Sequence, residues 1–291
     1  MDPRPGRSAR RATLPRPTDR LPLGRSGLTV SPFCLGQVRD PATVLAAFDA
    51  GINFFFVTAD MHWPLYEPLR RGLVQLLKRR RGIRDRIVVA AAAYATQPEF
   101  CWWPFREVLG AVPGLGRVDV TVAGGAYGYE LHRRLPVYRE HVRQEHVGAR
   151  AIGVSFHDRK AARDAVKAST VDIAFVRYNA SHPGARKEIY PHLSVRHKTL
   201  LYGFTSTDGF VAPRRVRELG LANDFWRPAI TDGYRFALTP PQVNGVLCSL
   251  STPREVEALG RALEHGPLDA EEEQYLVDLA GLDQGRAVLK K

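Results

Sequence analysis

The sequence predicts a single (β/α)₈ barrel, and three observations support this prediction. Short apolar runs typical of buried parallel strands alternate eight times with longer segments of helical periodicity. The chain has 291 residues, and a barrel of eight such units takes roughly 250 residues. No Gly/Ser-rich linker interrupts residues 21–291, which predicts one domain over this range.

The expected elements follow one another in a regular order. A β-hairpin at residues 21–32 would plug the bottom of the barrel, because apolar residues alternate on both sides of a glycine-containing turn. The eight strands are expected at residues 33–37, 52–57, 87–92, 118–123, 149–154, 171–176, 198–203 and 244–247. The first helix should start at Pro41 after an Asp40 cap and end before Gly51. The other helices are expected at residues 64–78, 98–112, 130–145, 159–167, 184–193, 213–221, 227–238, 253–263 and 269–279.

The chain is basic, with a net charge of +12 and a pI of about 9.9. An arginine-rich, solvated surface is the simplest interpretation, because net charge informs solubility and nonspecific binding rather than fold. A nucleic-acid partner would require a basic stripe with a reader motif, and the sequence contains no such motif. An anionic small-molecule substrate remains open.

Other features bear on the compartment. The three cysteines, Cys34, Cys101 and Cys248, have no metal-type spacing and suggest a reducing environment. No apolar run approaches the roughly 18 residues that span a membrane. Residues 1–20 are rich in Arg and Pro without the apolar segment of a secretory signal, and we expect them to form a disordered basic tail. These features predict a cytoplasmic protein with no membrane partner.

The stretch at residues 51–63, GINFFFVTADMHW, carries the strongest functional signal. A continuous apolar strand ends in a polar cluster that contains Asp60 and His62. In a parallel barrel the carboxyl ends of the strands hold the chemistry. His62 could act as the acid or base and Asp60 could orient it. The competing interpretation is that Asp60 caps the next helix and His62 has no task.

Further candidates follow other strands in the same way. They are Trp63, Tyr94, His157, Arg177, Tyr178 and Asn179, which would bind the substrate. Arg177 could hold an anionic group bidentately or form an internal ion pair. A metal site of His62, His157 and Asp60 is conceivable, but its spacing matches no zinc pattern, so no metal is predicted.

Several segments together resemble the aldo-keto reductases. They are LGRSGLTVSPFCLG, GINFFFVTAD, GVSFH, VRYNASHPGA and LCSLSTPREVEAL, which keep the family's order between Leu21 and about Leu279. The resemblance implies the reductase barrel with its N-terminal hairpin and an activity that reduces carbonyl groups with NADPH. It also implies a tetrad of Asp, Tyr, Lys and His.

None of the four tetrad residue types is retained. The family's Asp falls on Val57, or on Phe56 if the extra aromatic residue is placed differently. The Tyr, Lys and His positions fall on His62, Ala92 and Gly124. A proton donor at this site would therefore lack the charges that tune it in the family.

The implied cofactor site is also incomplete. The resemblance assigns Ser155, Phe204, Ser249, Ser251 and Arg254 to NADPH. The positions of the family's Asn and Gln beside the nicotinamide fall on Phe156 and Phe175, and Glu255 and Leu259 replace the typical Arg and Asn of the phosphate segment. We therefore expect either no cofactor or weak NADP binding.

The leading hypothesis is a diverged aldo-keto reductase barrel that acts on a small molecule by acid/base chemistry without hydride transfer, such as elimination, cyclisation or isomerisation. The first alternative is an NADPH-dependent oxidoreductase with His62 as the proton donor. The second alternative is a non-catalytic pseudoenzyme scaffold, since a fold does not decide its function.

Overall fold

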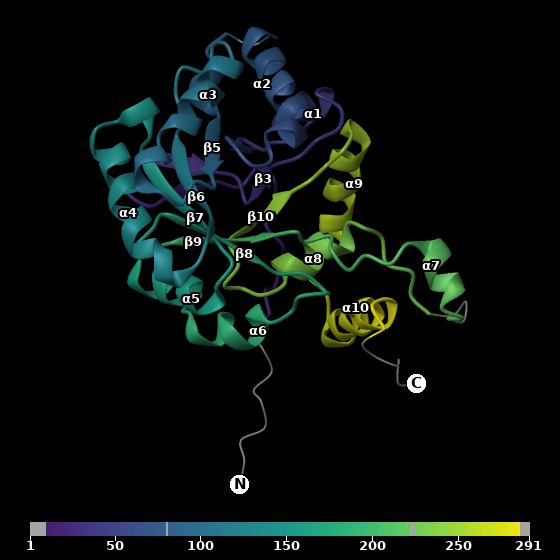
Figure 1. Ribbon diagram of the computed structural model, residues 1–291. Coiled ribbons are helices and arrows are strands. Elements are labelled where there is room, and N and C mark those ends of the chain that lie inside the picture. Colours follow the sequence, from purple (N-terminus) through teal and green to yellow (C-terminus); the bar gives the residue numbers. More distant parts are fainter. Residues whose placement is uncertain (1–9, 80, 222–224, 286–291) are drawn as a thin grey trace.

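The computed structural model describes residues 10–79, 81–221 and 225–285, and its centre is a closed barrel of parallel strands (Figure 1). The strand order is β10-β3-β4-β5-β6-β7-β8-β9, so neighbours in the chain are neighbours in the barrel. The strands are β3 (Phe33–Leu35), β4 (Phe54–Thr58), β5 (Val88–Ala93), β6 (Val120–Ala126), β7 (Ala151–Phe156), β8 (Ile173–Arg177), β9 (Leu200–Phe204) and β10 (Gly245–Cys248). The predicted barrel is confirmed.

Helices surround the barrel and cover its outer face (Figure 1). They are α1 (Ala42–Asp49), α2 (Glu67–Arg79), α3 (Trp103–Ala111), α4 (Gly128–Arg143), α5 (Arg159–Ala168), α6 (Ala185–Glu188), α7 (Pro213–Glu218), α8 (Asp232–Leu238), α9 (Pro253–Glu264) and α10 (Ala270–Asp283). The predicted second and third helices each begin with a separate 3₁₀ turn, η1 (Trp63–Tyr66) and η3 (Pro98–Phe100). A proline within the first two positions of each turn favours this tighter start.

The predicted N-terminal hairpin is confirmed as two antiparallel strands, β1 (Leu21–Leu23) and β2 (Leu28–Val30). Asn53, just before β4, fixes the hairpin to the barrel. Its side chain accepts a hydrogen bond from the Ser31 amide (2.7 Å) and donates one to the Thr29 carbonyl (2.9 Å). The hairpin is thus tied to the start of the strand that leads into the site.

The start of the described chain contacts the barrel. Residues 10–20 of the expected tail belong to the described residues, whereas residues 1–9, like residues 286–291 at the end of the expected domain, lie outside them. The Arg11 amide donates to Thr239 (3.1 Å), its Nε donates to Leu238 (3.2 Å), and Arg10 pairs with Glu273 (3.0 Å). The guanidinium groups of Arg10 and Arg11 hold this segment on the rest of the fold, because each has a carbonyl or carboxylate partner there.

Strand β4 is buried along its whole length. The turn before β4 depends on Gly51. Its φ is +106°, and a Cβ on this residue would lie only 2.8 Å from the Thr18 side chain. Only glycine adopts that φ without strain, so α1 ends here as predicted and the chain turns directly into β4.

Candidate functional site

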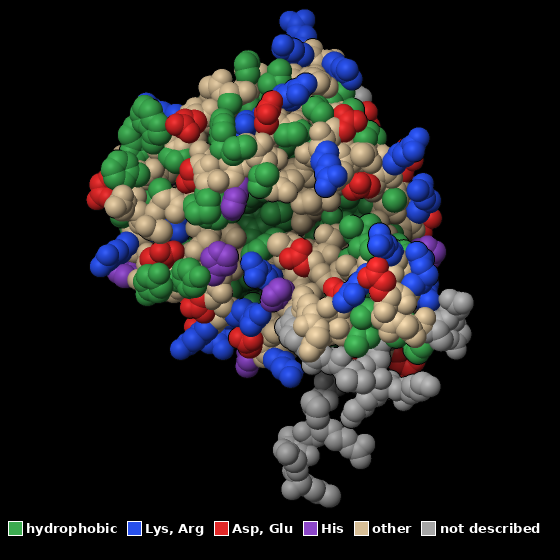
Figure 2. Space-filling view, turned by 45° about the vertical axis from the view of Figure 1, so that its right-hand side comes forward, with side chains coloured by type: hydrophobic (Ala, Val, Ile, Leu, Met, Phe, Trp, Pro, Cys, Tyr) green, Lys and Arg blue, Asp and Glu red, His purple; other side chains and the backbone are tan. Residues whose placement is uncertain are grey.

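The carboxyl ends of the strands surround a cavity of about 770 Å³. Figure 2 shows the hollow on this face, with hydrophobic side chains at its bottom and histidines at its rim. The lining residues come from the carboxyl ends of all eight strands and from the turns and helices that follow them. They include Gln37, Phe56, Met61, His62, Tyr66, Tyr94, Thr96, Gly124, Gly125, Tyr127, Tyr129, Glu130, Ser155, His157, Phe175, Arg177, Phe204, Thr205, Ser206, Thr207, Asp208, Tyr234, Leu247 and Ser249.

Two phenylalanines belong to the buried part of the cavity wall. Phe56 of β4 and Phe175 of β8 are buried, and their rings meet edge to face with centroids 5.3 Å apart. Phe56 lines the cavity and Val57 does not. Of the two positions considered for the tetrad Asp, the one on the cavity wall therefore carries a phenylalanine, which cannot ionise.

Tyr94 occupies the space above Gly124. A Cβ at Gly124 would lie 3.0 Å from three atoms of the Tyr94 ring, which is tighter than ordinary van der Waals contact. The same ring leaves little room for a side chain at Gly125, because a Cβ there would lie 3.3 Å from the Tyr94 ring. Gly124, to which the resemblance assigned the tetrad His, therefore has no room for a larger side chain beneath the Tyr94 ring.

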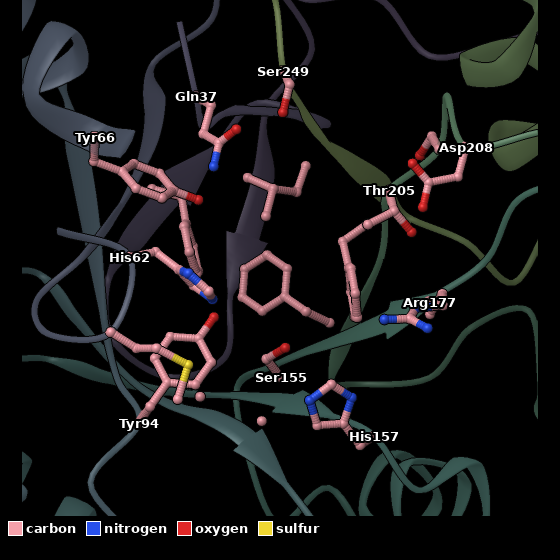
Figure 3. A pocket seen from close by; sticks show the side chains of 18 of the residues that line it. Gln37, His62, Tyr66, Tyr94, Ser155, His157, Arg177, Thr205, Asp208 and Ser249 are labelled. Atoms are coloured by element: carbon pink, nitrogen blue, oxygen red, sulfur yellow. The ribbon is translucent and has the colours of Figure 1, made fainter. Parts of the chain in front are cut away.

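His62 lies beside Tyr94 in the cavity (Figure 3). The two rings meet edge to face, with centroids 5.2 Å apart and an interplanar angle of 82°. Burial, and secondarily the charge of Asp60, raises the pKa of Tyr94 above its ordinary value. The phenol therefore stays protonated and available as a donor beside the imidazole.

Asp60 does not orient His62. Its Oδ2 accepts hydrogen bonds from the amides of Tyr94 (2.6 Å) and Ala95 (3.2 Å), and its Oδ1 accepts one from Met61 (2.7 Å). No hydrogen bond joins it to the imidazole within the described part of the chain. The carboxylate instead ties the end of β4 to the end of β5 and so positions Tyr94. This corrects the assignment of Asp60 as the orienting carboxylate.

Trp63 lies away from the cavity. The guanidinium of Arg70 lies over its indole ring, 3.6 Å from the centroid, and the Arg70 Nη1 donates to the Trp63 carbonyl (2.7 Å). This stacking fixes the η1 turn against α2 and withdraws Trp63 from substrate binding, which corrects its predicted role.

The two residues after β8 also have structural roles. Tyr178 is fully buried, its hydroxyl accepts a hydrogen bond from Arg186 Nε (2.6 Å), and its ring stacks on Phe236 at 5.1 Å. Side chains alternate along a strand, so Phe175 and Arg177 face the cavity while Tyr178 faces the helices. Tyr178 therefore packs in the core rather than against a substrate.

Asn179 is also buried and supports the cavity from behind. Its Nδ2 donates to the Thr205 carbonyl and to the Thr205 hydroxyl, both at 3.0 Å. Thr205 lines the cavity with a φ of +54°, an unfavourable conformation for a β-branched residue. Asn179 thus holds a strained turn in place and does not itself reach the cavity.

His157 and Arg177 stand at the exposed rim (Figure 3). The His157 ring lies 5.4 Å from that of Tyr127, and the guanidinium of Arg177 lies 6.0 Å from the Phe204 ring centroid. Among the described residues, no carboxylate pairs with Arg177. The ion-pair interpretation of Arg177 therefore finds no support in this part of the chain.

The expected cofactor residues separate into two groups. Ser155, Phe204 and Ser249 line the cavity. Ser251 and Arg254 do not, and the amide of Ser251 donates to the carboxylate of Glu255 (2.8 Å) at the start of α9. An anion of the chain itself thus occupies this backbone donor, which is not free to bind a phosphate.

Sequence reasoning missed several lining residues. Tyr66 belongs to η1, and burial raises the pKa of its hydroxyl. Gln37 follows β3, and Asp208 follows β9. The rule that strand ends carry the site would have found Gln37 and Asp208. Tyr66 could not be found in this way, because it enters from a turn.

The fold is similar to the folds of solved aldo-keto reductases. A Bacillus halodurans aldo-keto reductase in its holo form gives a TM-score of 0.67 at 18% identity, with 94% of this chain and 99% of that chain covered. A Bombyx mori aldo-keto reductase in complex with NADP gives 0.67 at 15%, covering 90% and 92%. A thermostable aldo-keto reductase in complex with epalrestat gives 0.64 at 17%, covering 89% and 99%.

The chain has the aldo-keto reductase fold. No protein-family model matches the sequence, and no curated protein matches it either. At such identities the likeness concerns the fold alone, and the chemistry follows from the residues of this chain's own cavity.

The described residues contain neither a metal-binding cluster nor a membrane-spanning helix. Across residues 10–79, 81–221 and 225–285, no three His, Cys, Asp or Glu side chains gather closely enough to hold a metal ion, so His62, His157 and Asp60 do not form the conceivable site. In the same ranges no helix has the length and apolar character needed to cross a bilayer.

Proposed function

We propose that this chain is a small-molecule enzyme that uses the aldo-keto reductase fold for proton transfer without hydride transfer. The observation that carries the proposal is the pairing of His62 with Tyr94 inside the cavity. An imidazole can take or give a proton, and a phenol that stays protonated donates a hydrogen bond to a developing negative oxygen. Elimination, cyclisation and isomerisation can each use this pair of functions.

The roles of the residues follow from their contacts. His62 takes a proton from the substrate or gives one to it, and the Tyr94 hydroxyl donates a hydrogen bond to the reacting oxygen. Asp60 is a positioning residue, because it holds the backbone of Tyr94 at 2.6 Å. The apolar rings of Phe56 and Phe175 exclude water from the bottom of the cavity, which strengthens electrostatic interactions there.

The test compares three variants in the native producer after deletion of the chromosomal gene. His62→Gln and Tyr94→Phe should each abolish or strongly change the metabolite profile, because general acid–base catalysis supplies about 10² to 10⁴-fold in rate. Exposed His132→Gln is the matched control. If both site variants restore the wild-type profile at wild-type abundance, the catalytic proposal fails and the scaffold alternative gains.

A second candidate is an NADPH-dependent oxidoreductase with His62 as proton donor. Ser155, Phe204 and Ser249 favour it, because they line the cavity. Glu255 opposes it, because it occupies the backbone donor at the start of α9. Titrating the protein with NADPH and following cofactor fluorescence separates the two candidates. Micromolar binding, together with rapid NADPH oxidation by simple aldehydes, would favour the oxidoreductase.

A further inference from the structure

Phenylalanine and tyrosine rings form a large part of the cavity wall. They come from β4, β8 and β9, from the segments that follow β4, β5 and β6, and from α8, namely Phe56, Tyr66, Tyr94, Tyr127, Tyr129, Phe175, Phe204 and Tyr234. Aromatic rings in offset or edge-to-face contact attract one another beyond the burial of their area, so this wall favours an aromatic ligand. A volume of about 770 Å³ is large enough for a fused two- or three-ring molecule.

Some charged side chains of the cavity have ion-pair partners in the described part of the chain, and others do not. Glu130 already accepts hydrogen bonds from Arg134 (3.2 Å) and from the Tyr127 amide (3.0 Å). Arg177 and Asp208 make no ion pair within the described residues. A guanidinium without a carboxylate partner at the edge of an aromatic cavity is suited to a carboxylate on a ligand.

Arg177 lies across the barrel from the reacting groups. It ends β8, whereas His62 follows β4, and these two strands are four steps apart in either direction around the closed barrel. Figure 3 shows the guanidinium on one side of the cavity and the His62 and Tyr94 rings on the other. A ligand that touches both sides must therefore span the cavity.

We propose that the substrate is an aromatic carboxylate that lies across the mouth, with its carboxylate on Arg177 and its reacting end at His62 and Tyr94. The orientation rests on the proposed function, since that function assigns the reacting end. The carboxylate contact and the aromatic preference rest on the cavity alone. Asp208 at the same rim opposes the anion, so Arg177 alone supplies the attraction.

Calorimetric titration with 2-naphthoate and its neutral amide tests the carboxylate contact. Wild-type protein should bind the carboxylate at least about 10-fold more tightly than the amide, because a charge-assisted contact distinguishes them. Arg177→Gln should remove this preference, and Arg177→Lys should keep part of it. Asp208→Asn, a change at the same rim, should tighten naphthoate binding. Saturated decahydro-2-naphthoate should bind more weakly than the aromatic acid.

The inference is overturned if neither probe binds at millimolar concentration, if the two bind equally, or if Arg177→Gln keeps the preference with unchanged thermal unfolding. The His62→Gln variant distinguishes failure of this inference from failure of the proposed function. Whatever its affinity for the two probes, that variant should keep the preference for 2-naphthoate over the amide, because Arg177 supplies it. Arg177-dependent binding without any effect of His62 or Tyr94 on metabolites would leave the binding inference standing and remove the catalytic proposal.

Discussion

The ring of Tyr94 lies directly over Gly124, at a distance that leaves no room for a side chain: a Cβ on Gly124 would come within 3.0 Å of three ring atoms. Asp60 supports this arrangement through the Tyr94 amide, and the His62 ring lies in edge-to-face contact with the phenol ring. The absence of a larger residue at position 124 is therefore a condition for the phenol's position in the cavity.

Gly124→Ala should displace Tyr94. Overpacking of a tight site costs about 1–3 kcal/mol, so the free energy of unfolding should fall by this amount. The displaced phenol should also lower any activity that depends on it. Urea unfolding measures the first effect and metabolite profiling the second.

Gly260→Ala in α9 is the matched control. A Cβ there meets nothing within 4 Å, so this change should stabilise by about 0.5–1 kcal/mol. Equal effects of the two substitutions would contradict the steric argument.

Asp60→Ala should destabilise the protein through the loss of hydrogen bonds to the Met61, Tyr94 and Ala95 amides. Bonds to a charged acceptor contribute about 1.5–3 kcal/mol, and Asp60→Asn should cost less because its amide oxygen still accepts. Chemical denaturation measures both losses, and near-ultraviolet circular dichroism reports the tyrosine environment. Unchanged stability together with lost product would instead assign Asp60 to the chemistry of His62.

Arg11→Ala tests whether the segment before the hairpin belongs to the folded protein. The Nε hydrogen bond to Leu238 should be lost, so this carbonyl would lose a charged donor, whereas the backbone amide bond to Thr239 does not need the side chain. We expect a loss of about 1–3 kcal/mol in the free energy of unfolding. Arg16→Ala, at an exposed side chain in the same segment, should change it by less than about 0.5 kcal/mol. If both variants unfold as the wild type does, residues 10–20 contribute nothing to the fold.

His141 makes the stability of the protein depend on pH. Burial, with a smaller contribution from the neighbouring His146, lowers the pKa of His141 from 6.5 to about 4, and the two rings lie 5.1 Å apart. The unfolded state therefore binds more protons between pH 6.5 and 4, and stability should fall as the pH drops through this range. We expect this group to account for about 2 kcal/mol, less than the full shift implies because solvent reaches the edge of the cluster.

Thermal unfolding between pH 4 and 7.5 measures this dependence. His141→Asn should flatten the curve between pH 4 and 6.5, while His132→Asn on the exposed face of the same helix should leave its shape unchanged. A curve that keeps the wild-type slope after the His141 change would assign the acid sensitivity to other groups.

Periodicity alone predicts much of this protein. Strands buried on both faces read as continuous apolar runs, such as 54–57 in β4, and the polar residues that follow mark the carboxyl ends. Neighbouring parallel strands bring these ends together, so His62, Tyr94, His157 and Arg177 could be assigned to one cavity from the sequence. Strand alternation, applied to residues 175–178, would also have directed Tyr178 away from the cavity.

Tertiary structure decided which partners the polar groups have. Asp60 and His62 are two positions apart, yet the carboxylate bonds to the Tyr94 amide, 34 residues away, because β4 pairs with β5. Trp63 stacks on Arg70 once η1 turns into α2, and Glu255 takes the Ser251 amide once α9 begins. Local sequence order determines where strands end. Hydrogen-bond partners depend on three-dimensional distances between strand ends, and only the closed barrel sets those distances.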